Sequence, residues 1–71
     1  MLSLQEVADI YGYEDEMDML EDCVTDSLVP CCCRNDNCEY TTELEPDCTN
    51  GWCEECREGS LVSVLIMAGI M

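Results

Sequence analysis

Histidine and lysine are both absent from this 71-residue chain, and only two arginines supply positive side chains. Without histidine the chain lacks the commonest general base, and a metal site of mixed cysteine and histidine ligands is excluded. There is also no glycine-rich phosphate loop, and no serine lies in the turn typical of hydrolase nucleophiles. These absences predict a protein that is not an enzyme.

Positive charge is scarce: the chain has 17 acidic side chains but only two basic ones, which gives a net charge of −15. The phosphates of DNA, RNA and anionic membranes would be repelled, so we expect no direct nucleic-acid ligand and no membrane partner. The same charge favours a protein partner with a basic surface. It is also typical of proteins adapted to a cytoplasm with high salt.

The first residues lack the basic and apolar regions of a secretory signal, which predicts a cytoplasmic protein. The length predicts a single small domain over residues 1–71, of α+β class, with a helical part in residues 1–30 and an apolar tail in residues 59–71. The core of so small a domain barely offsets the conformational entropy lost on folding, so disulfide bonds or a bound metal ion are expected to stabilise the fold.

Cysteine, by contrast, is abundant, with eight residues in the chain. Cys33 and Cys38 are separated by four residues, Cys53 and Cys56 by two, and the two pairs by fourteen. Each pair can provide half of a tetrahedral site, and the stretch between them is long enough for a β-hairpin. The spacing predicts a zinc ribbon over residues 31–58, with one structural Zn²⁺ bound by these four thiolates.

Other assignments of the cysteines stay open at this level. Cys31 or Cys32 could replace Cys33 as a ligand. Cys48 could compete with Cys53. Iron uses the same four-cysteine ligand set, and a disulfide framework is a further alternative. Three consecutive cysteines are awkward for disulfides, however, and the Cys-x2-Cys spacing is typical of metal sites in a reducing cytosol.

The N-terminal pattern predicts a helix over residues 3–11. Ser3 and Glu6 have the spacing of a capping box, and Gly12 is a plausible end point. A second helix is expected from Glu14 to the Val29–Pro30 step, with Cys23 as a small buried residue within it. Its buried stripe is predicted to consist of Met17, Leu20, Val24 and Leu28.

The tail from residue 60 to residue 71 is strongly apolar but too short to span a bilayer, which takes about 20 apolar residues. We expect it to fold back as a strand or short helix onto the N-terminal helices. Alternatively, it docks against another chain, which would make the protein a homo-oligomer or an assembly component. Trp52 can pack over the metal and keep water from the thiolates, and plain hydrophobic packing is an alternative that is compatible with this role.

Several segments carry a resemblance to a known group of proteins. They are the Val29–Pro30 step before the cysteines, the stretch 40–47 between the pairs, the segment 51–56, and the ending Ala68-Gly69-Ile70. Together they are similar to small zinc-ribbon proteins of tailed phages, especially phages of cyanobacteria. The resemblance implies a compact ribbon and a viral setting in the host cytoplasm. Glu39 and Arg57 depart from it, because ribbons often have glycine after each pair.

The expected function is therefore a non-enzymatic, zinc-binding protein-interaction module. It would be a phage accessory protein whose acidic face engages a basic host protein, as a nucleic-acid mimic or inhibitor. The alternative is a structural virion or assembly component that docks through its apolar C-terminal tail. An iron-containing electron carrier is a third hypothesis, and it predicts a coloured protein.

Overall fold

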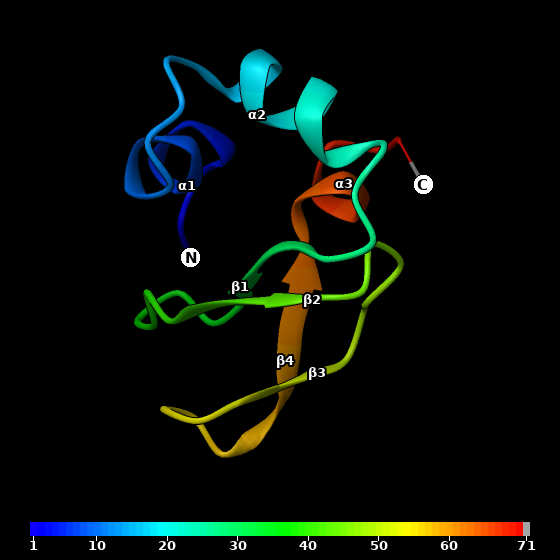
Figure 1. The fold of residues 1–71 in the computed structure, drawn as a ribbon. Coiled ribbons are helices and arrows are strands. Elements are labelled where there is room, and N and C mark those ends of the chain that lie inside the picture. The colour runs from blue at the N-terminus through cyan, green and yellow to red at the C-terminus, as the bar shows by residue number, and fades with distance from the viewer. Residues whose placement is uncertain (71) are drawn as a thin grey trace.

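The computed structural model describes residues 1–70 and is of α+β class, with three short helices on one side of a curled antiparallel sheet (Figure 1). The elements in chain order are α1 (Leu4–Ile10), α2 (Glu16–Cys23), β1 (Val29–Cys33), β2 (Thr41–Leu44), β3 (Gly51–Cys53), β4 (Glu58–Ser63) and α3 (Val64–Met67).

Helix α1 begins at the predicted capping box. Ser3 Oγ accepts a hydrogen bond from the backbone N–H of Glu6 (3.2 Å), and Glu6 Oε1 accepts one from the backbone N–H of Ser3 (3.0 Å). Two otherwise unpaired backbone groups are satisfied in this way. The chain leaves the helix at Gly12, whose φ of 83° favours glycine. The prediction of this helix is confirmed.

Helix α2 is shorter than predicted. It begins after Asp15, whose carboxylate accepts from the backbone N–H of Asp18 (2.8 Å), and it ends at Cys23 rather than at Val29. The next residues form a turn, in which Thr25 Oγ1 donates to the carbonyl oxygen of Asp22 (3.2 Å). Short polar side chains of this kind compete with the helix for backbone groups, which explains the early end.

The predicted buried stripe of α2 is wrong for three of its four residues. Met17, Val24 and Leu28 are exposed, and only Leu20 is buried. Helix α2 instead turns a neighbouring face, formed by Met19, Leu20 and Cys23, toward the core. The predicted burial of Cys23 is confirmed. The sequence has two apolar faces in this region. The predicted stripe includes Val24 and Leu28, which lie after the end of the helix at Cys23.

The sheet consists of two hairpins. Its strand order is β2-β1-β4-β3, with β1 pairing to β2, β4 pairing to β3, and β1 joined to β4 at the centre. The predicted single hairpin between Cys38 and Cys53 is therefore wrong, because β2 and β3 lie at opposite edges. Strands buried on both faces belong at the centre of a sheet. β1 is buried throughout, whereas β2 is only half-buried, and this sets the order.

The core has two parts, one on each face of the sheet. Successive side chains of a strand point to opposite faces. Cys32 accordingly packs among the helices, while Cys31 and Cys33 pack on the other side. Val64 and Leu65 also lie in the helix-side core, so this part of the tail is folded back onto the helices. Within residues 1–70, no helix has the length and apolarity needed to cross a membrane.

Candidate metal centre

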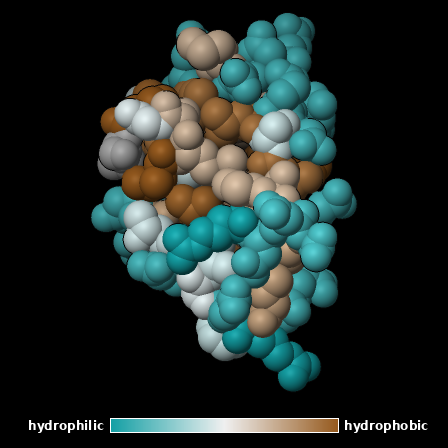
Figure 2. Space-filling view, turned by 180° about the vertical axis from the view of Figure 1, so that it is seen from behind, coloured by the Kyte–Doolittle hydropathy of each residue, from teal (hydrophilic) through white to brown (hydrophobic). Residues whose placement is uncertain are grey.

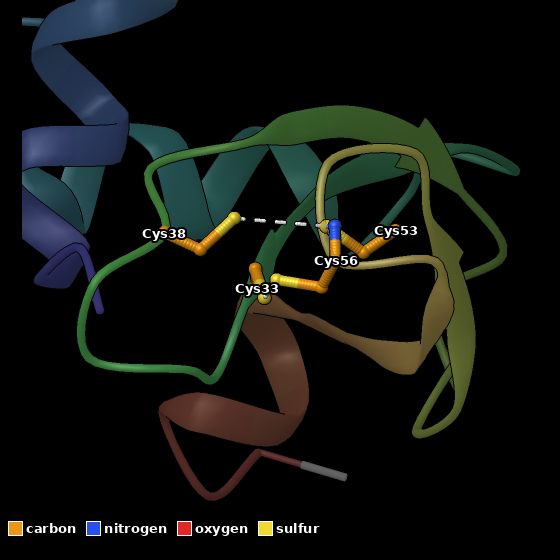
Figure 3. A group of neighbouring side chains, drawn as sticks. All are labelled: Cys33, Cys38, Cys53 and Cys56. Atoms are coloured by element: carbon orange, nitrogen blue, oxygen red, sulfur yellow. Dashed lines mark hydrogen bonds between the residues drawn. The ribbon is translucent and has the colours of Figure 1, made fainter.

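Four cysteine side chains converge at one end of the sheet (Figure 3). Cys33 ends β1 and Cys53 ends β3, while Cys38 and Cys56 lie in the loops that follow these strands. Pairing of β1 with β4 brings the two hairpins side by side, with Cys33 opposite Leu61. All four predicted ligands are thereby brought together, and their Sγ atoms lie within 4.8 Å of one another.

The distances fit a metal ion bound by four thiolates. The Sγ atoms of Cys33 and Cys56 are 3.7 Å apart, and those of Cys38 and Cys53 are 3.6 Å apart. A tetrahedral zinc ion with Zn–S bonds of about 2.3 Å requires sulfur atoms about 3.8 Å apart. Four sulfur donors suit Zn²⁺ or iron. The cluster could therefore hold a metal ion, and all four of its ligands would come from the protein.

The cluster is largely closed to solvent, but not by Trp52. Cys33 and Cys53 are fully buried, Cys38 is 7% exposed and Cys56 is half-buried, whereas Trp52 is 56% exposed. The expectation that Trp52 covers the site is wrong. In β3 the residue before Cys53 must point to the opposite face of the strand, so Trp52 cannot share the side on which Cys53 meets the other thiols. Tyr40 packs against the cluster instead.

Three hydrogen-bond donors surround the sulfur atoms. The backbone N–H of Cys56 donates to Cys53 Sγ (3.4 Å), and Asn35 Nδ2 donates to Cys56 Sγ (3.2 Å). Ser60 Oγ lies 3.1 Å from Cys33 Sγ. Groups of this kind orient metal ligands and stabilise the negative charge of thiolates.

Sequence reasoning missed both side chains that contact the sulfur atoms. Asn35 carried a usable signal, because an amide two residues after a ligand cysteine lies inside the first metal-binding loop. The sequence around Ser60 gives little indication of its role, since Ser60 is one small polar residue within the strand β4. Its role depends on the register of β1 against β4, in which the backbone N–H of Arg34 donates to the Ser60 carbonyl oxygen (2.9 Å).

The thiols of the cluster do not ionise alike. Burial works to raise the pKa of Cys33, but hydrogen bonds from Ser60, from the Asn35 backbone and from neighbouring thiols lower this pKa to about 7. A hydrogen bond with the Tyr40 backbone lowers the pKa of Cys38. Burial and the hydrogen bonds of Cys38 with the other thiols outweigh this effect and raise the pKa to about 12. One thiolate is thus favoured and a second is opposed, until a cation neutralises the charge.

The remaining cysteines of the second half lie outside the cluster. Cys32 faces the helices, and its Sγ lies 3.2 Å from the Sδ atom of Met67. Cys31 is fully buried, and burial raises its pKa to about 12. Cys48 packs against the sheet near Cys31. Among the residues that the structure describes, only Cys33, Cys38, Cys53 and Cys56 form a group of three or more possible metal ligands.

The turn between β3 and β4, which contains Cys56, has a strained residue. Arg57 has a φ of 56° and is the one non-glycine residue with positive φ in the described part of the chain. Its backbone N–H donates to the carbonyl oxygen of Cys53 (2.7 Å), which closes the turn between β3 and β4. Left-handed backbone at this point explains why glycine is common there in zinc ribbons. Glu39, after the first pair, does not have positive φ.

Comparison of the chain with protein-family models, with curated proteins and with solved structures found no match. The resemblance to phage zinc-ribbon proteins therefore stays a prediction. The case for a metal centre depends on the geometry and chemistry of the four cysteines.

Proposed function

We propose that this protein is a non-enzymatic, zinc-binding module whose acidic face engages a basic surface on a partner protein. The observation that supports it is the cluster of four thiols, three of them buried, spaced as a tetrahedral zinc ion requires. Four protein thiolates leave no position for a substrate, so the ion would stabilise the fold. For structural zinc this contribution is on the order of 10 kcal/mol at neutral pH.

The charge distribution supports the second half of the proposal. Nine of the 17 acidic residues lie before β1, and no lysine or arginine occurs before residue 34. They are Glu6, Asp9, Glu14, Asp15, Glu16, Asp18, Glu21, Asp22 and Asp26. All but the half-buried Glu16 are exposed. Such a concentration of charge attracts a basic surface over a long range and speeds association with it.

In this proposal the module occupies a site that its partner otherwise uses for nucleic acid. A phage accessory protein acting on a host protein is the setting that the sequence resemblance favours. Helices α1 and α2 are fixed on the sheet by a shared core, so that their carboxylates need little ordering on binding.

The first test combines metal analysis with binding. We expect one zinc ion per chain, and specific capture of a nucleic-acid-binding protein from bacterial lysate by the zinc-loaded form but not by the chelated form. The captured protein should be released as salt rises. A variant carrying Glu14→Gln, Asp18→Asn and Glu21→Gln should bind more weakly and with a shallower salt dependence.

The matched control has the same change of charge at the β2 edge, through Glu43→Gln, Glu45→Gln and Asp47→Asn. All six carboxylates are exposed, so neither variant should disturb the core. Affinity that stays flat between low and high salt, or an equal loss in both variants, would rule out recognition by the acidic helical half.

The second candidate function is an assembly component that docks through its C-terminal tail. Ile70 supports it, because this side chain is 51% exposed. Val64 and Leu65 weigh against it, since both are buried in the helix-side core and cannot dock elsewhere without unfolding the protein. Mass under native conditions separates the two, because an assembly component should form a defined oligomer and the module a monomer.

A further inference from the structure

An apolar groove of about 340 Å³ lies between α2 and the end of the described chain. Its lining residues are Met17, Leu20, Glu21, Val24, Ala68 and Ile70. Met17 is 60% exposed, Val24 is 53% exposed and Ile70 is 51% exposed, so three exposed apolar side chains are grouped at this one place. Figure 2 shows apolar surface gathered over the helical half of the molecule, with hydrophilic residues around it.

The groove is lined by two exposed apolar side chains, Met17 and Val24, with the buried Leu20 between them. Met17, Leu20 and Val24 follow one another at spacings of three and four residues, as on one face of a helix. Helix α2 packs on the core through its neighbouring face, with Met19 and Cys23 fully inside. It therefore has apolar side chains on two adjacent faces, and the protein itself covers one of them. The second face is available to a partner.

The charges around the groove indicate which kind of partner fits. Glu21 lines the groove, and the exposed Glu14 and Asp18 lie on or just before the same helix. A second copy of this chain would bring equal carboxylates together, which is unfavourable at a net charge of −15 per chain. An occupant with apolar residues flanked by lysine and arginine would instead cover the apolar lining and pair its positive charges with the carboxylates around the groove.

We propose that this groove binds a basic amphipathic helix of a partner protein. The apolar side chains of that helix enter between α2 and Ile70, and its cationic side chains pair with carboxylates of α2. A helix is the matching occupant because the groove runs beside α2, with the exposed Met17 and Val24 seven positions apart on one face of it. The inference rests on the proposed function and deepens it, by naming the contact site and the chemistry of the partner segment.

The test uses the full zinc-loaded chain and three synthetic peptides of about 18 residues. The first is an amphipathic helix of leucine and lysine, the second has the same composition in scrambled order, and the third is an amphipathic helix of leucine and glutamate. Fluorescence anisotropy of labelled peptides gives each dissociation constant. The leucine–lysine helix should bind at least about tenfold more tightly than either of the others.

A groove variant with Met17→Gln and Val24→Thr should bind the leucine–lysine helix about tenfold more weakly, because apolar burial is lost. Ile10→Gln is the matched control. This side chain of α1 is 56% exposed and does not line the groove, so binding should be unchanged. Circular dichroism and thermal unfolding should show that both variants keep the fold.

Three outcomes would overturn the proposal in different ways. Equal binding of the scrambled peptide, with no effect of the groove variant, would exclude the groove and leave recognition by charge standing. Equal binding of the leucine–glutamate helix, lost in the groove variant, would exclude a basic partner and with it the proposed function. A homodimer that only the groove variant dissociates would show that a second copy occupies the groove.

Discussion

The side chain of Asn35 connects the two halves of the cysteine cluster, because it lies in the loop between Cys33 and Cys38 and donates from Nδ2 to Cys56 Sγ (3.2 Å). The same nitrogen also donates to Glu58 Oε1 (2.7 Å), which fixes its direction. An N–H group in this position stabilises a thiolate and orients it toward a bound ion. The contact therefore has consequences for metal affinity as well as for the local fold.

We expect Asn35→Ala to weaken zinc binding by about tenfold or more, the usual cost of losing an outer-shell partner of a ligand. Competition with a chromophoric chelator measures the change. Asn37→Ala is a matched control, because Asn37 is an exposed amide of the same loop. An equal loss in both variants would show that loop stability, rather than the bond to Cys56, sets the affinity.

Zinc binding should release one proton fewer per ion at about pH 8 than at about pH 6. The pKa of Cys33 in the fold is lowered to about 7, so its thiolate stabilises the fold above the ordinary thiol pKa. That contribution is lost as the pH falls through about 7. At the higher pH Cys33 has already lost its proton before the metal arrives. Titration calorimetry in buffers of different ionisation enthalpy counts the released protons.

Ser60→Ala should move this change in proton release to higher pH, because the hydroxyl beside Cys33 Sγ helps to lower the pKa of that thiol. Thr49→Ala is a control for hydroxyl removal at an exposed site away from the cluster. A proton count that stays constant through pH 7 in the unaltered protein, and changes only near the ordinary thiol pKa of about 8.5, would mean that the hydrogen-bonded cluster does not exist before metal binds.

The cysteine spacing predicted which side chains meet, because two short loops of fixed reach can place four sulfur atoms around one point almost regardless of the strands between them. The sequence also predicted the capping box of α1, since Ser3 and Glu6 interact within one turn of the helix. Both features depend on local geometry. Local geometry is what a sequence specifies most directly.

Features that depend on tertiary pairing could not be predicted in this way. The fourteen residues between Cys38 and Cys53 have the length of one hairpin, but the fully buried β1 takes a central position and draws β2 to one edge. The buried face of α2 was misassigned because Met17 and Met19 are both apolar, and only packing against α1 and α3 selects between them. The exposure of Trp52 depends on the alternation of side chains in β3, and a strand of three residues leaves too short a pattern to be predicted from sequence.

Arg57→Gly should stabilise the zinc-loaded protein by about 0.5–1 kcal/mol. The left-handed conformation at φ 56° costs a side chain roughly 1–2 kcal/mol, and glycine avoids this cost at the expense of greater freedom when unfolded. Urea unfolding at fixed free zinc measures the gain. Arg57→Ala is the control, because it removes the charge but keeps the Cβ atom. If alanine stabilises the protein as much as glycine, charge rather than backbone strain is responsible.

Gly51→Ala should destabilise the protein by about 1–3 kcal/mol, the usual cost of forcing atoms into a packed site. A Cβ atom at Gly51 would lie 2.5 Å from Leu44 Cδ1, 2.9 Å from Cys48 Sγ and 2.9 Å from Leu61 Cβ. These neighbours come from both hairpins and from the loop between β2 and β3, so the clash cannot be relieved by moving one flexible end.

The fluorescence of Trp52, next to Gly51, can follow urea unfolding of this variant. Gly12→Ala is the comparison, because its added Cβ would meet nothing within 4 Å and only its φ of 83° opposes alanine. We expect Gly12→Ala to cost about 1 kcal/mol from backbone strain alone. If Gly51→Ala proved no more costly than Gly12→Ala, then the contact between the two hairpins at Gly51 would be looser than the structure shows.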